Sequence, residues 1–269
     1  MTALAAADPL AAADPLAPLR ATLAAMGGRP DQPPIRGLAP DLTVADPHGW
    51  TPASALVSGQ MLADLLDTAQ RRWSAAPHVA AALAWKHYTY WVALPAVLGY
   101  AAARRIPDLR PSGVLLRWSA REPFLTVGLA PAEVVALAAD PLASQPGIRA
   151  VTDEAALLVE LCRALVEEHL APLLGQIRAR VHVGRRTLWG SLASGVAHGL
   201  SRAAPVVSGS SLAYANAMLT ALGVADLVDL QPRAGGPGLQ VHRRTCCLAF
   251  ALPEPKLCTG CPVPDGHGG

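Results

Sequence analysis

Apolar residues recur with the period of an α-helix over most of the chain between residues 51 and 222. A first helix is predicted from residue 51 to residue 73, capped by Thr51 and Pro52, with its apolar face at Leu62, Leu65, Leu66 and Ala69. The same period predicts further helices over 77–105 with a kink at Pro95, 131–139, 152–170 with Thr152 as cap, 171–182, 185–200 and 208–222.

The pattern changes between Gly113 and Leu129, where two short apolar runs flank the polar stretch SAREP. Such a pattern predicts a β-hairpin. A Pro/Gly-rich linker at 231–238 then leads to the C-terminal residues. The expected fold is therefore mainly α with a small β-hairpin element, an α+β arrangement in which a helical body carries a C-terminal segment.

Three regions are expected along the chain. Residues 1–48 are rich in Ala, Pro, Asp and Gly and predict a mobile leader with room for one short helix. Residues 49–238 are interpreted as a mainly helical, substrate-binding body. Residues 239–269 form the C-terminal segment, which contains four of the five cysteines.

Charge and hydropathy narrow the classes of partner. The 22 basic and 20 acidic side chains leave a formal net charge of +2, so no global field favours nucleic acid. The apolar run from Trp91 to Ala103 is too short to span a bilayer, and Asp8 and Asp14 argue against a secretory signal. We therefore expect a cytoplasmic protein with no transmembrane segment, in which cysteines stay reduced.

The C-terminal cysteines are Cys246, Cys247, Cys258 and Cys261, an adjacent pair followed by Cys-x-x-Cys. A structural zinc, two disulfides and an iron–sulfur cluster compete for these sulfurs. Disulfides are disfavoured by the compartment and by the strain of an adjacent pair, whereas zinc and iron–sulfur remain about equal on spacing alone. Neighbouring side chains on a strand point to opposite faces, so both sulfurs of the pair can serve one site only if the chain turns or bulges there.

The stretches RRTCCLAF and LCTGCP together resemble the C-terminal signature of FhuF-type ferric-siderophore reductases. That signature is Cys-Cys, ten residues, Cys-x-x-Cys, with an arginine ahead of the first pair, here Arg243 or Arg244, and a proline after the last cysteine, here Pro262. The stretch TLWGSLAS at 187–194 is similar to a Leu-Trp-Gly stretch of the family's body, so the resemblance extends over about residues 50–265.

The resemblance implies a [2Fe–2S] cluster on Cys246, Cys247, Cys258 and Cys261, and an oxidoreductase that reduces Fe³⁺ held in a siderophore of the hydroxamate type. No glycine-rich dinucleotide motif is present, so electrons are expected from an external donor such as a ferredoxin. The alternative is a non-enzymatic protein that binds a siderophore or senses iron or redox state, and a zinc-stabilised binding module is third.

Candidate substrate-binding residues are few. Arg243 and Arg244 lie beside the first cysteine pair, where positive charge would also raise the potential of an anionic cluster. Trp189 either lines a substrate pocket or anchors a helix, and the anchor is favoured. The basic group Arg178, Arg180, Arg185 and Arg186 is interpreted as a solvated face more readily than as a docking site. Cys162 is expected to be a buried thiol unrelated to the cluster.

Overall fold

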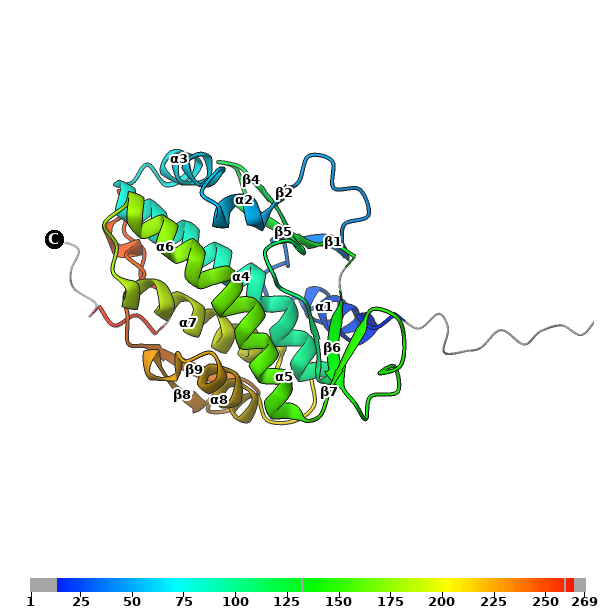
Figure 1. The fold of residues 1–269 in the computed structure, drawn as a ribbon. Coiled ribbons are helices and arrows are strands. Elements are labelled where there is room, and N and C mark those ends of the chain that lie inside the picture. The colour runs from blue at the N-terminus through cyan, green and yellow to red at the C-terminus, as the bar shows by residue number, and fades with distance from the viewer. Residues whose placement is uncertain (1–13, 132, 259, 264–269) are drawn as a thin grey trace, which may run out of the picture.

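The computed structural model describes residues 14–131, 133–258 and 260–263, which are arranged around the long helix α4 (Pro77–Ala103) (Figure 1). Pro77 occupies the first turn of α4, where a missing N–H costs nothing, and Arg104 ends the helix in the left-handed conformation. Because α4 is apolar on nearly all sides, it is stable only when it is surrounded. Its neighbours include α1 (Ala17–Gly27), α3 (Leu62–Trp73) and α7 (Arg185–Ala203).

Two small sheets cover other parts of α4. The first has the order β1–β5–β4–β2, with β1 (Leu38–Thr43) parallel to β5 (Leu125–Leu129), and with β4 (Val114–Trp118) antiparallel to both β5 and β2 (Thr51–Pro52). The second joins β3 (Arg105–Pro107), β6 (Val134–Leu137) and β7 (Ile148–Val151), with β6 and β7 parallel.

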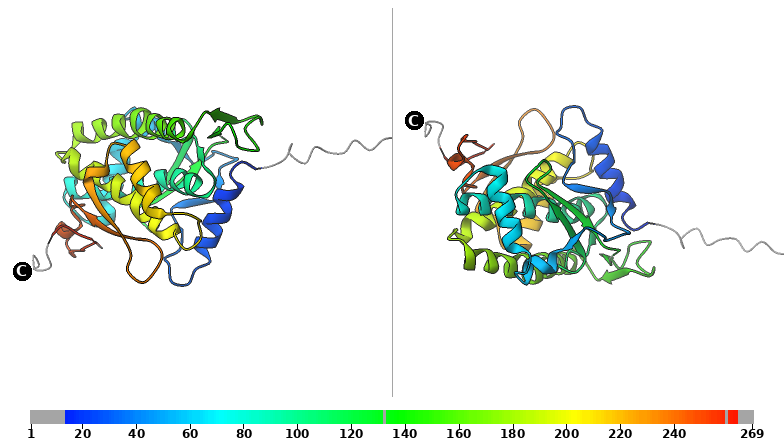
Figure 2. Two further views of the ribbon diagram at one scale, coloured as in Figure 1. Left: turned by 90° about the horizontal axis from the view of Figure 1, so that it is seen from below. Right: turned by 90° about the horizontal axis from the view of Figure 1, so that it is seen from above.

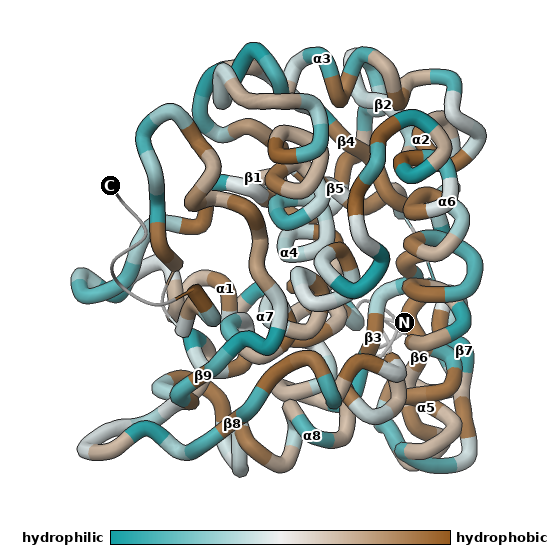
Figure 3. The backbone as a smooth tube through the Cα atoms, turned by 90° about the vertical axis from the view of Figure 1, so that its left-hand side faces the viewer, coloured by the Kyte–Doolittle hydropathy of each residue, from teal (hydrophilic) through white to brown (hydrophobic). Residues whose placement is uncertain are grey.

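The remaining helices complete the body. The short helix α2 (Ala53–Val57) precedes α3, and α5 (Glu154–Leu161) continues through a π-helical stretch, Cys162–Leu170, into α6 (Ala171–Arg180). Helix α8 (Ser211–Ala221) and a 3₁₀ turn at Ala225–Leu227 lead to the hairpin of β8 (Val228–Pro232) and β9 (Leu239–Arg243). The hairpin lies beside α7 and α8 (Figure 2), and its connecting loop projects from the body (Figure 3).

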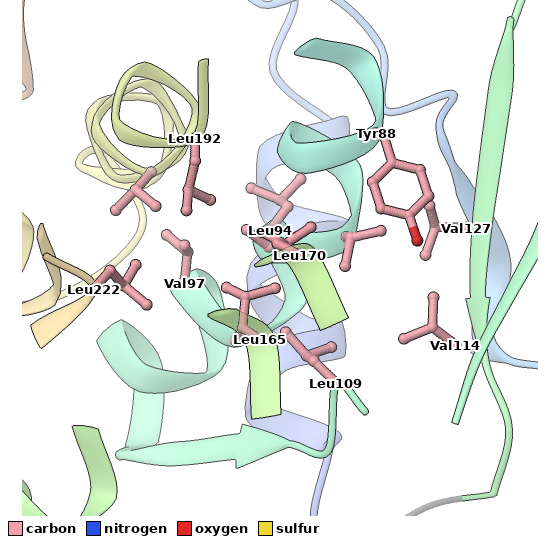
Figure 4. Close-up of a cluster of buried hydrophobic side chains, with 14 of the residues drawn as sticks. Tyr88, Leu94, Val97, Leu109, Val114, Val127, Leu165, Leu170, Leu192 and Leu222 are labelled. Carbon is pink, nitrogen blue, oxygen red and sulfur yellow. The ribbon is translucent and has the colours of Figure 1, made fainter. Parts of the chain in front are cut away.

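The core forms where α4 meets α7 and the π-helical stretch (Figure 4). Leu94 and Val97 of α4 gather there with Leu192 of α7 and with Leu165 and Leu170 of the π-helical stretch. All five side chains are almost completely buried. This contact fixes α4 and α7 relative to each other, and both helices also contribute to the candidate site.

The structure confirms the expected α+β fold and the hairpin, which is β4–β5. The helix expected over 131–139 is wrong: residues 134–137 form strand β6, where β-branched Val134 and Val135 pair with β7. The helix expected over 51–73 is interrupted, because Gly59 has a φ of +82° between α2 and α3, and Thr51 lies in β2. Asp153, and not Thr152, caps α5.

The chain enters the fold earlier than the sequence indicated. Residues 1–13 of the expected leader lie outside the described residues, but α1 and β1 belong to the body, and Leu19, Met26 and Leu42 are buried in the core. Folded structure therefore begins well before residue 49. None of the helices in the described part of the chain has the length and hydropathy needed to cross a membrane.

His169 is completely buried in the core. Its Nδ1–H donates to the Leu109 carbonyl at 2.7 Å, so Nε2 accepts from the Tyr88 hydroxyl. Burial lowers the pKa of His169 to about 4. The folded protein thus keeps this imidazole neutral at a pH at which the unfolded chain protonates it.

This difference predicts a pH-dependent stability. Between pH 6.5 and about 4 the unfolded state binds a proton at His169 that the folded state does not, so the free energy of unfolding falls as the pH falls, by about 1.4 kcal/mol per pH unit from this group. Urea titrations at several pH values across this range give the free energy of unfolding as a function of pH. This free energy should depend less steeply on pH in His169→Gln, whereas His182→Gln, at an exposed position, should keep the wild-type pH dependence. Equal pH dependence in all three proteins would contradict the assignment.

Candidate functional site

Strand β9 delivers the chain to the cysteine segment, which we define as residues 243–262. The backbone N–H of Arg243 donates to the Gly260 carbonyl at 2.9 Å, and that of Arg244 donates to the Leu227 carbonyl at 3.0 Å. Gly260 has a φ of +70°, and a Cβ at this position would lie 1.9 Å from the Val241 carbonyl oxygen. Only glycine satisfies both conditions, so Gly260 lets the second pair of cysteines fold back against β9.

The adjacent cysteines lie in irregular backbone outside any strand, as the sequence required of any site that uses both sulfurs. Strand β9 ends at Arg243, and neither Cys246 nor Cys247 belongs to a strand. Leu248 follows with a φ of +64°, and its N–H donates to Cys246 Sγ at 3.3 Å. A 3₁₀ turn at Ala249–Ala251 then leads away from the pair.

The two pairs of cysteines approach each other through Cys247 and Cys258, whose Sγ atoms are 3.8 Å apart. Cys246 interacts electrostatically with Cys247 and with Cys261, so the four thiols lie in one neighbourhood. All five cysteines of the chain are free thiols, and Cys162 lies apart on the π-helical stretch. Among the described residues, no three His, Cys, Asp or Glu side chains converge as they would around a single metal ion.

The sulfurs differ in how readily they ionise. The hydrogen bond with Cys258 lowers the pKa of Cys247, and Lys86, the N–H of Ala249 and Arg243 act in the same direction against the effect of burial. The same bond raises the pKa of Cys258. Thiolate is the form that binds metal, so within this pair the surroundings favour Cys247 as the thiol that ionises first.

Helix α4 supplies the wall behind Cys247. Val79 and Leu83 pack against Cys247 and Ala249, and the Cys247 side chain is only 2% exposed. Lys86, one turn further along α4, places Nζ 3.8 Å from Cys247 Sγ. Lys86 could not be singled out from the sequence, because it lies 161 positions before the cysteine that it contacts.

Helix α7 supplies the second wall. The Arg243 side chain is buried, its Nε donates to the Thr245 carbonyl at 3.2 Å, and its guanidinium lies 3.5 Å from Ser191 Oγ. Thr245 packs so closely on Gly190 that a Cβ there would lie 1.7 Å from Thr245 Oγ1. Thr245 Oγ1 is itself buried against α7, with no hydrogen-bond partner among the described residues.

A hollow of about 360 Å³ lies between α4 and α7 next to Lys86. Tyr90, Trp91, His87 and His198 line it together with Lys86, Ser191 and Arg202. Burial, followed by the nearby Lys86, lowers the pKa of His87 to about 4; burial also lowers the pKa of His198 to about 4. Both imidazoles are therefore neutral at neutral pH, and the positive charge of the hollow comes from lysine and arginine.

The structure separates the three substrate-binding candidates. Arg243 reaches the cysteines, but it is buried beneath them. Arg244 turns away into an ion pair with Asp229, with Nε 2.8 Å from the carboxylate. Trp189 packs edge-to-face on Trp85, with ring centroids 6.1 Å apart, and lines a different hollow together with Arg185 and Arg186.

The cysteine segment matches a known family. The model of the FhuF 2Fe-2S C-terminal domain matches residues 243–262, a range that contains both cysteine pairs. This match confirms the resemblance at the cysteine segment and gives the segment a [2Fe–2S] cluster as its cofactor, whereas the stretch at 187–194 lies outside the matched residues. No curated protein matches the chain.

The four thiols and the irregular backbone at the adjacent pair suit such a cluster, because each of its two irons takes two thiolate ligands. The free thiols argue against disulfides, and the family match favours iron–sulfur over zinc. The residues present therefore fit the cofactor.

The contact of Gly190 with Thr245 gives a direct test of how the segment is held. Gly190→Ala should push residue 245 away from α7, lower the iron and sulfide content per chain, and destabilise the protein by about 1–3 kcal/mol through overpacking. Gly175→Ala is the matched control, because nothing lies within 4 Å of the added Cβ; we expect full cluster loading and a gain of about 0.5–1 kcal/mol. Equal loading and equal stability in the two variants would refute the role of this contact.

Proposed function

We propose that this chain, whose C-terminal segment is a FhuF-type [2Fe–2S] domain, reduces siderophore-bound Fe³⁺ to Fe²⁺ by one electron. Cys246, Cys247, Cys258 and Cys261 are the proposed cluster ligands. Residues 239–269 would then be the cluster-binding segment and the preceding body the substrate-binding part. The observation that supports this most strongly is the position of Cys247 against Lys86, which also lines the hollow between α4 and α7.

The chemistry of the substrate suits a one-electron reaction. A bound [2Fe–2S] cluster supplies one electron, and Fe³⁺ accepts one. Siderophore oxygens are hard ligands that hold Fe³⁺ more firmly than Fe²⁺, so reduction weakens the chelate and lets softer ligands compete for the iron. The chelator itself remains intact.

The chain's own residues prepare the site for negative charge. Lys86 lies 3.8 Å from Cys247 Sγ, and the Arg243 guanidinium is buried beneath the cysteines. Positive groups at these positions favour the more negative, reduced form of an anionic centre and so raise its potential. Arg244 contributes less than the sequence suggested, because Asp229 offsets its charge.

The proposal also specifies the electron donor, the chelate and the compartment. The electrons come from a separate one-electron carrier such as a ferredoxin. The chelate contains hydroxamate groups. The reaction takes place in the cytoplasm, where thiols stay reduced. A non-enzymatic siderophore-binding or redox-sensing role is the alternative, and it differs in that the reduced protein would not pass its electron to a ferric chelate.

Replacement of single cysteines tests the proposed ligands. Serine at position 246, 247, 258 or 261 should abolish the visible absorption of the cluster or strongly reduce it, because a ligand to iron is lost. Cys162→Ser is the control and should retain the absorption, iron and sulfide of the wild type, since Cys162 lies on the π-helical stretch. A full cluster in any of the four C-terminal variants would remove that cysteine from the ligand set.

Single-turnover oxidation tests the reaction. The dithionite-reduced protein, freed of excess reductant, should be reoxidised by a ferric hydroxamate chelate with one Fe²⁺ trapped per cluster. The matched gallium(III) chelate should leave it reduced, because Ga³⁺ does not accept an electron under these conditions. A cluster that stays reduced with every ferric chelate tried would contradict the reductase and favour the sensor.

A further inference from the structure

A second hollow, of about 280 Å³, adjoins the one beside Lys86, and we call the two together the trough. They share Pro33, Pro34, His87 and Trp91. The first hollow is built by α4, α7 and the connection between α1 and β1, and the second adds residues of α3 and of the connection between β4 and β5. Each hollow is close to the size range of small-molecule sites, and together they are well within it.

The net charge of the side chains that line the trough is positive. Lys86 and Arg202 line the first hollow, Arg36 and Arg72 line the second, and Glu122 is the single carboxylate among the described lining residues. The Glu122 carboxylate lies 3.7 Å from the Arg72 guanidinium, so the charges of these two side chains offset each other. Within the described part of the chain, the Arg202 side chain donates to uncharged groups, the Gln32 amide and the Pro33 carbonyl, and these partners do not neutralise its charge. A ligand with negative charge would be favoured over a neutral one.

Two lining residues connect the trough to the cysteine segment. Lys86 contacts Cys247, and Ser191 lies 3.5 Å from the Arg243 guanidinium. A ligand against Lys86 and Ser191 therefore lies one side chain away from the thiols, with Tyr90 and Trp91 as an aromatic wall. The hollow lined by Arg185 and Arg186 meets the cysteine segment at a different point, where the Leu227 carbonyl accepts from the Arg244 N–H. Its Arg186 is paired with Asp226, which offsets its charge.

We propose that the trough between α4 and α7 binds the ferric chelate, and that it selects hydroxamate chelates that carry net negative charge. This inference rests on the proposed function. Three singly charged hydroxamates neutralise Fe³⁺, whereas replacement of one by an α-hydroxycarboxylate leaves the complex anionic. The anionic ferric complex of a citrate-based dihydroxamate is thus attracted by the lysine and arginine side chains of the lining. The neutral ferric complex of a cyclic trihydroxamate gains no such attraction.

Calorimetric titration of the oxidised holoprotein with redox-inert gallium(III) chelates tests the site without electron transfer. The gallium complex of a citrate-based dihydroxamate should bind at least tenfold more tightly than that of a cyclic trihydroxamate. Lys86→Met should weaken binding of the anionic complex about tenfold and leave the neutral one unchanged, while Lys86→Arg should restore most of the affinity. Arg202→Gln, which changes a lining charge that bonds Gln32 and not the cysteines, provides a second variant should Lys86→Met fail to hold its cluster.

Arg185→Gln is the matched control, because it removes a cation from the other basic hollow and should leave both affinities unchanged. Equal affinity for the two complexes, unchanged affinity in both trough variants, or an equal loss in Arg185→Gln would overturn the inference. Single-turnover oxidation separates this failure from failure of the proposed function. Reoxidation by both ferric chelates at equal rates would support the reductase activity and contradict selective binding in the trough. A lack of reoxidation by either chelate would contradict the reductase activity itself.

Discussion

The close contact of the cysteine segment with α4 and α7 is the constraint on which the candidate site depends. Four thiols on a C-terminal segment have little apolar surface of their own to bury, so the body must hold them in place. Val79 and Leu83 cover Cys247, and Gly190 lets Thr245 approach α7 within the space that a methyl group would occupy. The tight packing of α4 against α7 thus sets the position of the segment.

The same contact explains how distant parts of the sequence act together. Lys86 belongs to α4, whereas Arg243 belongs to β9, and the two place positive charge on different sides of the adjacent cysteines. An anionic centre between them is stabilised in its more reduced form. Because Lys86 also lines the trough, one charge serves both the cysteine segment and the proposed ligand site.

The sequence predicted the local features of the site and left its surroundings open. The cysteine spacing and the departure from strand geometry at the adjacent pair are local, so residues close in sequence suffice to predict them. Lys86 and the trough arise from tertiary packing between α4 and α7, for which a single sequence carries no direct signal. Strand β6 was missed for the same reason: Val134 and Val135 suit a helix or a strand until β7 pairs with them. Likewise, the composition of residues 17–43 concealed α1 and β1, which are held by burial against the body.

In the proposed mechanism, a ferric chelate and the cluster occupy adjacent positions on either side of Lys86. Microwave power saturation of the electron paramagnetic resonance signal of the dithionite-reduced protein tests this adjacency most directly. The ligand is the chromium(III) complex of a citrate-based dihydroxamate, which is paramagnetic and exchanges slowly. We predict that binding of this complex speeds the spin relaxation of the cluster and raises the power needed for half-saturation. If calorimetry verifies binding of the complex in the same sample, an unchanged saturation curve would contradict the proposed adjacency of chelate and cluster.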